Sequence, residues 1–206
     1  MHRLKIIDSP NRLKRMTLYL ASTSPRRREL LAQTDINFTV LDITIDESQR
    51  PNELPTAYVE RLAKEKAEAG YQSIAADEHA VVLAADTIVV LEDDILGKPA
   101  DQNQAQIMLR ALSGRSHVVM TAFAIKTAEQ IRVQRVNTTV FFRSITSKEI
   151  DWYWQTGEQL DKAGGYGIQS KGGVFVSAIS GSYSAVVGLP LAEVITALQT
   201  YGIQPQ

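Results

Sequence analysis

The chain has 206 residues, of which 44% are hydrophobic and 22% charged, and its formal net charge is -1 at pH 7. These values are ordinary for a globular protein with one sizeable core, and the near-neutral charge gives no overall electrostatic reason to bind nucleic acid or a membrane surface. The absence of cysteine excludes disulfides, thiolate catalysis and cysteine-based zinc motifs, and with no apolar run of about 18 residues to span a bilayer we expect a cytoplasmic location.

Residues 1–15 are basic, and they contain no apolar core of the length that a signal peptide needs. We expect them to form an N-terminal tail in front of a single domain over residues 16–206. That domain is predicted to open with a short buried strand, TLYLAS, over residues 17–22. Ser24 and Pro25 follow as the N-cap and the first position of a helix.

The first turn of this helix carries three successive arginines, Arg26, Arg27 and Arg28. The exposed N–H groups of a helix N-terminus are already positive, so a cation there costs about 0.3 to 1 kcal/mol. An anion at the same place is stabilised. The sequence therefore predicts that a negatively charged ligand binds at the start of this helix.

A strand is predicted next over residues 37–45, NFTVLDITI, followed by a helix from Pro55 to Ala69 that Gly70 should end. The apolar face of this helix contains a lysine, Lys66, at helical spacing from its hydrophobic neighbours. Two interpretations follow. The lysine stem covers apolar surface while its amine reaches water, or the amine faces an anionic ligand.

A near-continuous apolar run over residues 80–91 predicts a central strand with both faces covered. Asp86 and Thr87 interrupt this run. An ionised carboxylate buried without a partner costs several kcal/mol or becomes neutral. Asp86 is therefore either a cap for the turn after the strand or a metal ligand or general base at the mouth of the sheet.

The remaining predicted elements include one hairpin and two further helices with capping boxes. They are a helix from Asp101 to Leu112, strands over 117–125 and 135–145, a helix over 149–155 capped from Thr146, a glycine-rich loop over 160–173, a strand over 174–179 and a closing helix over 188–198 with Pro190 near its start. Strands and helices alternate irregularly, so the predicted fold class is α/β with a mixed sheet.

Cationic and acidic side chains recur around these elements, namely Arg26, Arg27, Arg28, Asp46, Glu47, Lys66, Asp86 and Lys98. Arginine and lysine neutralise phosphate charge, and carboxylates bind Mg²⁺ or Mn²⁺ that also contacts phosphate oxygens. The pattern is typical of a polyphosphate site.

Other sites are excluded or weakly indicated. The chain has no P-loop, no GxGxxG fingerprint and no GxSxG elbow, and its three histidines lack the spacing of a zinc centre. The aromatic run Trp152–Trp154 either packs on a helix face or stacks on a base.

Seven motifs occur in order along the chain: SxSPRR at 22–27, RLAxEKA at 61–67, AADTIV at 84–89, GKP at 97–99, LSG at 112–114 followed by His117, DKAGGYGIQ at 161–169 and GSYxxVVGLPL at 181–191. Together they resemble the Maf family of nucleoside triphosphate pyrophosphatases, from Met16 to about Ile203. The resemblance implies a fold shared with inosine-triphosphate pyrophosphatases: an elongated mixed sheet flanked by helices, in two lobes around a cleft. It also implies a homodimer by analogy.

The activity that this resemblance implies is hydrolysis of a nucleoside triphosphate between its α and β phosphates, dependent on a divalent metal such as Mg, Mn or Co. By the same resemblance, Asp86 is the proton acceptor that activates water and holds the metal together with Glu47. Phosphate binding falls to Ser24, Arg26, Arg27, Lys66 and Lys98.

One branch of the family is similar to this chain at three selectivity positions, Arg26, Thr87 and Gln169, and that branch acts on dTTP and UTP. Modified pyrimidine nucleotides are further candidate substrates. The sister branch, which prefers 7-methyl-GTP, has an aromatic residue in place of Arg26 and a glutamine in place of Thr87. Neither of these is present here.

Three alternatives stay open at this point. They are the 7-methyl-GTP pyrophosphatase activity, a non-catalytic nucleotide-binding regulator of cell division, and an RNA-binding module built on the arginine cluster, which lacks any RNP or KH pattern. Within that cluster, Arg26 and Arg27 fall on the family motif and Arg28 does not. Because successive helical residues are about 100° apart, we expect only the first two to contact a ligand.

Overall fold

The computed structural model describes residues 16–74 and 77–206, so the predicted tail over 1–15 lies outside the described residues. The centre of the protein is a seven-stranded mixed sheet of order β2-β1-β3-β5-β6-β7, with β4 paired to β3. The strands are β1 Thr17–Ala21, β2 Thr39–Leu41, β3 Ala80–Leu91, β4 Asp94–Leu96, β5 Ser116–Lys126, β6 Ile131–Phe142 and β7 Val176–Ser180.

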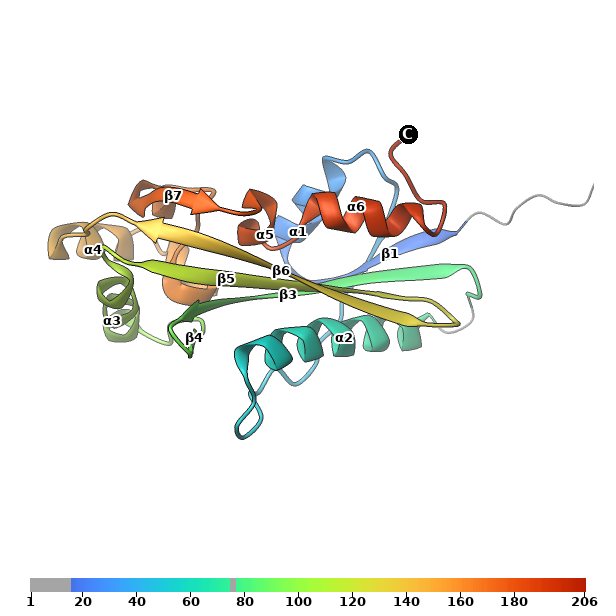
Figure 1. Ribbon diagram of the computed structural model, residues 1–206, viewed down its shortest axis with the longest axis horizontal. Helices are drawn as coiled ribbons and strands as arrows, with labels where there is room; N and C mark the ends of the chain where they lie inside the picture. The colour runs from blue at the N-terminus through green and yellow to red at the C-terminus, as the bar shows by residue number, and fades with distance from the viewer. Residues whose placement is uncertain (1–15, 75–76) are drawn as a thin grey trace, which may run out of the picture.

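Helices cover both faces of this sheet. They are α1 Pro25–Ala32, α2 Pro55–Ser73, α3 Gln102–Leu112, α4 Ser147–Trp154, α5 Tyr183–Val187 and α6 Leu191–Gln199, with short 3-10 helices η1 Glu158–Asp161, η2 Ala163–Gly165 and η3 Lys171–Phe175. Figure 1 shows α2 on one face and α1, α5 and α6 on the other. None of the helices in the described part of the chain is long and apolar enough to cross a membrane.

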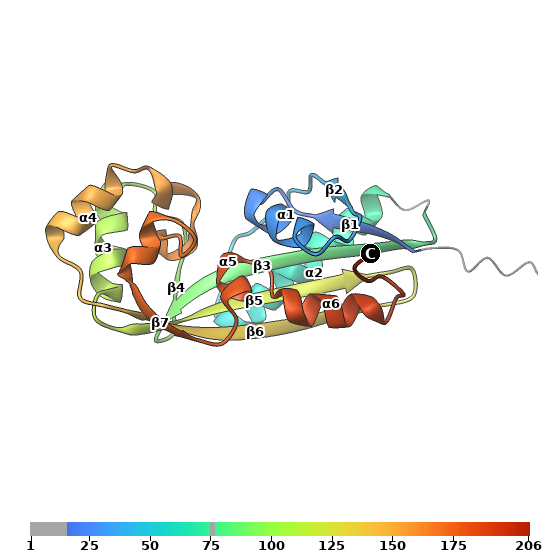
Figure 2. The ribbon, with the colours of Figure 1, turned by 90° about the horizontal axis from the view of Figure 1, so that it is seen from above.

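The molecule has two lobes joined by long strands. Figure 2 shows α3, α4 and the 3-10 segments at one end of the sheet, and α1, α2, β1 and β2 at the other, with β3, β5 and β6 running between them. We call the first end the distal lobe and the second the proximal lobe. The predicted α/β class, with an elongated mixed sheet flanked by helices in two lobes, is confirmed.

The central strand β3 has 12 residues, and all except Thr87 are buried. Side chains of a strand point alternately to its two faces. Val82, Ala84 and Ile88 accordingly join the hydrophobic cluster beneath α2, whereas Leu83 and Ala85 join the cluster with α1 and α6. This alternation directs Asp86 to the α2 face and Thr87 to the opposite face.

Two predicted element boundaries are wrong. Helix α2 continues through Gly70 to Ser73, because that glycine serves close packing and does not end the helix: a Cβ there would lie 2.7 Å from the Cβ of Ala21 on β1. The strand expected over 37–45 shortens to β2, Thr39–Leu41, because its partner β1 ends at Ala21, opposite Leu41.

The later part of the chain differs in smaller ways. Strand β6 begins at Ile131, four residues before the predicted start, because its ladder with β5 continues down to the pair Lys126–Ile131. The predicted capping box at Thr146 is confirmed. At Asp101 only half of it forms, since the Gln104 side chain accepts from the backbone N–H of Ala100. Helix α5, ahead of the predicted closing helix, was not expected.

Candidate active site

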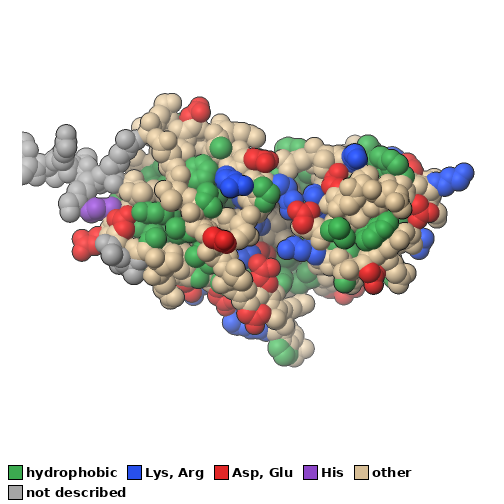
Figure 3. Space-filling view, turned by 180° about the vertical axis from the view of Figure 1, so that it is seen from behind, with side chains coloured by type: hydrophobic (Ala, Val, Ile, Leu, Met, Phe, Trp, Pro, Cys, Tyr) green, Lys and Arg blue, Asp and Glu red, His purple; other side chains and the backbone are tan. Residues whose placement is uncertain are grey.

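A gap in strand pairing opens the sheet between its two lobes. On one side, β3 pairs with β1 only as far as Leu83, and with β4 only from Val89 onward. The five residues 84–88 therefore have no strand partner on that side among the described pairings. A cleft of about 890 Å³ lies along this edge, and Figure 3 shows basic and acidic side chains gathered around the hollow between the lobes.

All nine residues named by the family resemblance line this one cleft: Ser24, Arg26, Arg27, Glu47, Lys66, Asp86, Thr87, Lys98 and Gln169. They come from α1, the segment after β2, α2, β3, the segment after β4 and the loop after η2. The structure thus brings together every residue that the resemblance named, although it leaves their individual roles as predictions. Asp46, which the charge pattern had added, lies outside the cleft lining and accepts hydrogen bonds from Ser48.

Lys66 connects the two acidic side chains of the cleft. Its Nζ lies 2.7 Å from Oδ1 of Asp86 and 2.6 Å from Oε1 of Glu47. Asp86 and Lys66 are 7% and 9% exposed, so each compensates the buried charge of the other. Two of the interpretations offered from the sequence are therefore wrong. The Lys66 amine does not reach out to water, and Asp86 lies inside a strand and does not cap the turn that follows it.

Glu47 lies at the outer end of this group, with 49% of its side chain exposed. Burial raises the pKa of its carboxyl, but the Lys66 ammonium, helped by Lys98 and Arg27, outweighs that effect and holds the pKa below its ordinary value. Glu47 is therefore ionised at neutral pH. Among the described residues, no three acidic or histidine side chains are grouped to hold a metal ion, and metal binding by Glu47 and Asp86 stays a prediction.

Arg27 is fixed by the protein in a single orientation. Its Nε donates to the carbonyl oxygen of Gly188 at 2.9 Å, and its second terminal nitrogen donates to Oγ1 of Thr87 at 3.2 Å. Burial lowers the pKa of the Arg27 guanidinium, an effect opposed by nearby Asp86, but an arginine remains charged at any physiological pH. The arginine is thus preorganised before a ligand arrives.

Thr87 belongs to a directional chain of hydrogen bonds. Thr121 donates to the carbonyl of Ala185 at 2.7 Å, so in the 3.0 Å contact between the two threonine hydroxyls Thr87 is the donor. Thr87 then accepts from Arg27. The contact that the structure shows for this predicted selectivity residue is to an arginine in the cleft.

The other two arginines of α1 differ in their surroundings. Arg26 forms a 2.9 Å ion pair with Asp161 from the distal lobe, whereas Arg28 is exposed and lies outside the cleft lining. Arg26 and Arg27 thus line the cleft and Arg28 does not, and their contacts with a ligand stay a prediction. Ser24 is the N-cap residue of α1 as predicted, but its side chain makes no capping hydrogen bond.

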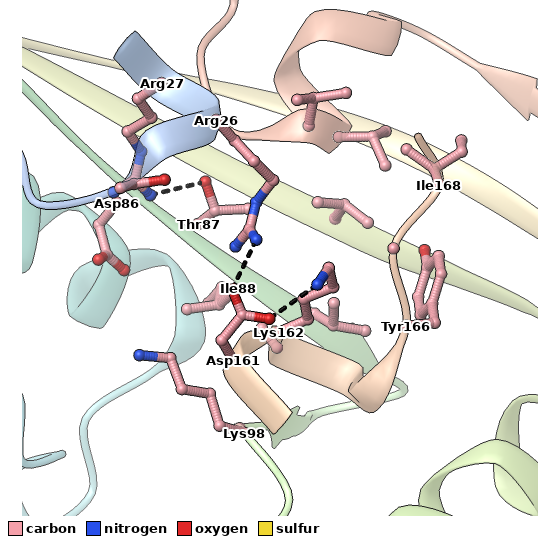
Figure 4. Close-up of a pocket in the computed structure, with 18 of the residues that line it drawn as sticks. Arg26, Arg27, Asp86, Thr87, Ile88, Lys98, Asp161, Lys162, Tyr166 and Ile168 are labelled. Carbon is pink, nitrogen blue, oxygen red and sulfur yellow. Dashed lines mark hydrogen bonds and ion pairs between the residues drawn. The ribbon is translucent and has the colours of Figure 1, made fainter. Parts of the chain in front are cut away.

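The distal wall of the cleft carries two charged residues to which the sequence had assigned no role. Asp161 and Lys162 form an ion pair of 2.7 Å, and Figure 4 shows Asp161 between Arg26 and Lys162, with Lys98 nearby. The only feature of the sequence that could have drawn attention to them is that they are the first two residues of the DKAGGYGIQ motif. Gln169, from the same motif, is exposed and lines the cleft.

Comparison with known proteins finds relatives that share one name. The chain is 52% identical over 184 residues to a dTTP/UTP pyrophosphatase of Pseudoalteromonas translucida, which covers 89% of this chain and 96% of the relative. It is 52% identical over 178 residues to a protein of the same name from Aliivibrio fischeri, covering 85% and 93%. A third such protein, from Hahella chejuensis, is 49% identical over 190 residues, covering 92% and 94%.

Among solved structures, the Staphylococcus aureus Ham1 protein is similar with a TM-score of 0.45 and 13% identity, over 61% of this chain and 71% of that one. The family described as Maf-like protein matches residues 17–201. That match spans both lobes and every residue of the cleft named above, and the chain therefore belongs to the Maf family.

Proposed function

We propose that this protein hydrolyses dTTP and UTP between the α and β phosphates, releasing the nucleoside monophosphate and pyrophosphate. The observation that carries the proposal is the buried pair of Asp86 and Lys66 at the open edge of the sheet, facing the same cleft as the preorganised Arg27. The relatives named dTTP/UTP pyrophosphatase support the choice of substrates.

Asp86 accepts the proton of the attacking water. Lys66 holds one carboxylate oxygen of Asp86 at 2.7 Å, which fixes the direction of the side chain and leaves the two lone pairs of the other oxygen for the water and for a metal ion. Water attacks the α-phosphorus in line with the departing pyrophosphate. A general base contributes about 10²- to 10⁴-fold to such a step.

The cations stabilise the charge that develops on the leaving pyrophosphate. Gly188 and Thr87 accept from two of the five N–H groups of Arg27, so the others remain for phosphate oxygens. Arg26 and Lys98 add charge from either side of the cleft. Because Arg27 is already oriented, little reorganisation of this donor is needed as the transition state forms.

A divalent metal is part of the proposal, and the donor set fits one. Mg²⁺ is usually held by one or two carboxylates together with substrate phosphates, and Glu47 and Asp86 lie close together in the cleft, each in contact with Lys66. The two carboxylates would hold the ion, and its chemistry would be to neutralise phosphate charge. Glu47 is half exposed and can turn toward an ion without breaking the Asp86–Lys66 pair.

Selection of the base is assigned to Gln169. Uracil and thymine present an O4 acceptor beside an N3–H donor, and a glutamine amide donates to one and accepts from the other. Cytosine reverses both groups, so an amide held in the orientation that pairs with uracil would be left unpaired. A site of this kind discriminates by up to about 10⁴-fold.

The test is to incubate the purified protein with each nucleoside triphosphate, with and without Mg²⁺, Mn²⁺ or Co²⁺, and to assay pyrophosphate and orthophosphate separately. We expect metal-dependent pyrophosphate from dTTP and UTP and little from dCTP. No pyrophosphate from any nucleotide would favour a non-catalytic regulator, and a preference for 7-methyl-GTP would favour the sister activity.

A homodimer is also proposed, by analogy with the family. Light scattering of the same sample measures the molecular mass and so tests the oligomeric state.

A further inference from the structure

The loop that carries Gln169 is held from behind by two side chains outside the cleft. Tyr153 on α4 is fully buried, and its hydroxyl donates to Oε1 of Glu158 at 2.8 Å. The same hydroxyl accepts from the backbone N–H of Gly167 at 3.1 Å. Tyr153 therefore attaches to the loop two residues before Gln169.

Glu158 attaches to the loop on the other side of Gln169. Its Oε2 accepts from the backbone N–H of Lys171 at 3.0 Å, and its Oε1 accepts from that of Gly172 at 3.2 Å. Burial raises the pKa of Glu158, but the hydrogen bonds that it accepts outweigh burial and leave the pKa below its ordinary value. An ionised carboxylate is the stronger acceptor.

The glycines of this loop are needed for its close approach to the two side chains. A Cβ on Gly172 would lie 2.8 Å from the Tyr153 hydroxyl and 2.8 Å from the backbone N of Gly167. A Cβ on Gly167 would lie 2.9 Å from Oε1 of Glu158. At Gly172 the obstructing atoms include the backbone of Gly167, so the two ends of the loop meet there because residue 172 is a glycine.

We propose that Tyr153 and Glu158 form a clamp that sets the position of Gln169 and so act as positioning residues for base selection. The inference rests on the proposed role of Gln169 in recognising the base. Neither clamp residue lines the cleft, so both act through the loop. The clamp also accounts for the central residue of the aromatic run at 152–154, which is buried in the distal lobe and stacks on no ligand in the cleft.

The first test compares kinetics of Tyr153→Phe with wild type for dTTP, UTP and dCTP. The phenyl ring preserves packing and removes only the hydroxyl, so we expect kcat for dTTP to stay within about twofold while KM rises about tenfold, as for a loss of uniform binding. Selectivity for dTTP over dCTP should fall by about the same factor. Tyr201→Phe is the matched control, because its buried hydroxyl makes no hydrogen bond to any described residue.

A second set of variants separates positioning from general destabilisation. Glu158→Gln keeps one acceptor oxygen and should lose less selectivity than Glu158→Ala. In a Gln169→Ala background, Tyr153→Phe should cause no further loss of selectivity, because residues that act as a unit are not additive. An equal, additive loss in both backgrounds would overturn the proposal.

Amide hydrogen exchange of the ligand-free protein tests the clamp without reference to activity. Tyr153→Phe should speed exchange at Gly167 and across 168–172 by about tenfold, with α2 unchanged. Wild-type protection of the loop together with wild-type selectivity would overturn the clamp. If Gln169→Ala retained wild-type selectivity, the proposed base recognition would fail instead, and loop exchange would still decide whether the clamp exists.

Discussion

The two walls of the cleft are built in different ways. On the proximal side, Asp86, Lys66 and Arg27 project from a strand and two helices and are held by hydrogen bonds between side chains, Lys66 to Asp86 and Arg27 to Thr87. On the distal side, Gln169 belongs to a glycine-rich loop whose backbone N–H groups are held by Tyr153 and Glu158. Regular elements thus position Asp86, Lys66 and Arg27 for the proposed phosphate chemistry, and a supported loop positions the group proposed for base selection.

This difference follows from what each wall must do. Catalysis by a buried charge pair requires side chains fixed to within a fraction of an ångström, which strands and helices provide. Recognition of a base edge requires a polar group at the cleft rim, where a loop can be shaped by its backbone contacts. We therefore expect substitutions on the proximal side to abolish turnover or stability, and those on the distal side to change KM and selectivity.

The largest expected effect is on the proximal side, at Asp86→Asn. The amide cannot accept a proton from water, so kcat for dTTP should fall about 10²- to 10⁴-fold, measured as pyrophosphate release. Circular dichroism should show that the fold is retained. A variant that kept the wild-type rate would refute the assignment of Asp86 as the base.

The second prediction concerns stability. Lys66→Met removes the partner of a carboxylate that is 7% exposed, and breaking a buried ion pair in this way costs about 3 to 5 kcal/mol of unfolding free energy. Urea denaturation measures the loss. In an Asp86→Asn background the same change should cost clearly less, because no buried carboxylate is left unpaired. Equal costs of Lys66→Met in the wild-type and Asp86→Asn backgrounds would contradict this account.

Glu47→Gln provides a comparison at a half-exposed position. It should lower the unfolding free energy by less than about 1 kcal/mol.

The third prediction extends the comparison to the distal lobe, where His117 is 3% exposed and contacts the hydroxyl of Tyr166 at 2.7 Å. Burial lowers the pKa of His117 from 6.5 to about 4. The unfolded chain therefore binds a proton between these pH values and the folded chain does not, so stability is fully present above pH 6.5 and declines as the pH falls toward 4.

That decline should reach about 3 kcal/mol at pH 4. It is measured as the difference in unfolding free energy between wild type and His117→Gln at each pH, a comparison in which the contributions of the carboxylates cancel. If the unfolding free energies of the two proteins changed in parallel with pH, His117 would not be a buried, neutral imidazole in the folded protein.

The smallest effects separate the arginines of α1. Arg26 lines the cleft and Arg28 is exposed outside it, so Arg26→Ala should lower kcat/KM for dTTP by about 10- to 100-fold, the value of a hydrogen bond to a charged group. Arg28→Ala should change kcat/KM less than about twofold. Equal losses in steady-state kinetics would mean that the helix start acts only through its total charge.

Much of the candidate site was predictable because local pattern and chemistry agreed. An arginine-rich helix start predicts an anion, and a carboxylate within an apolar strand predicts a compensating partner. The second expectation is met, because Asp86 is paired with Lys66, whereas the first stays a prediction, with Arg26 and Arg27 at one wall of the cleft. Gly70 shows the opposite case, since a glycine that was expected to end a helix is instead required for packing against a strand far away in the sequence.

By itself, the sequence determined the periodicity of the long strands and helices, the lack of cysteine chemistry and the residue types of a polyphosphate site. Only the tertiary structure decided how Asp86 and Thr87, which point to opposite faces of β3, reach one cleft: the pairing of β3 changes from β1 to β4 and leaves its edge open between them. It likewise joined Tyr153 to Gly167 and Glu158 to Gly172. Such contacts depend on strand pairing and loop closure between distant segments, which no local pattern of residues encodes.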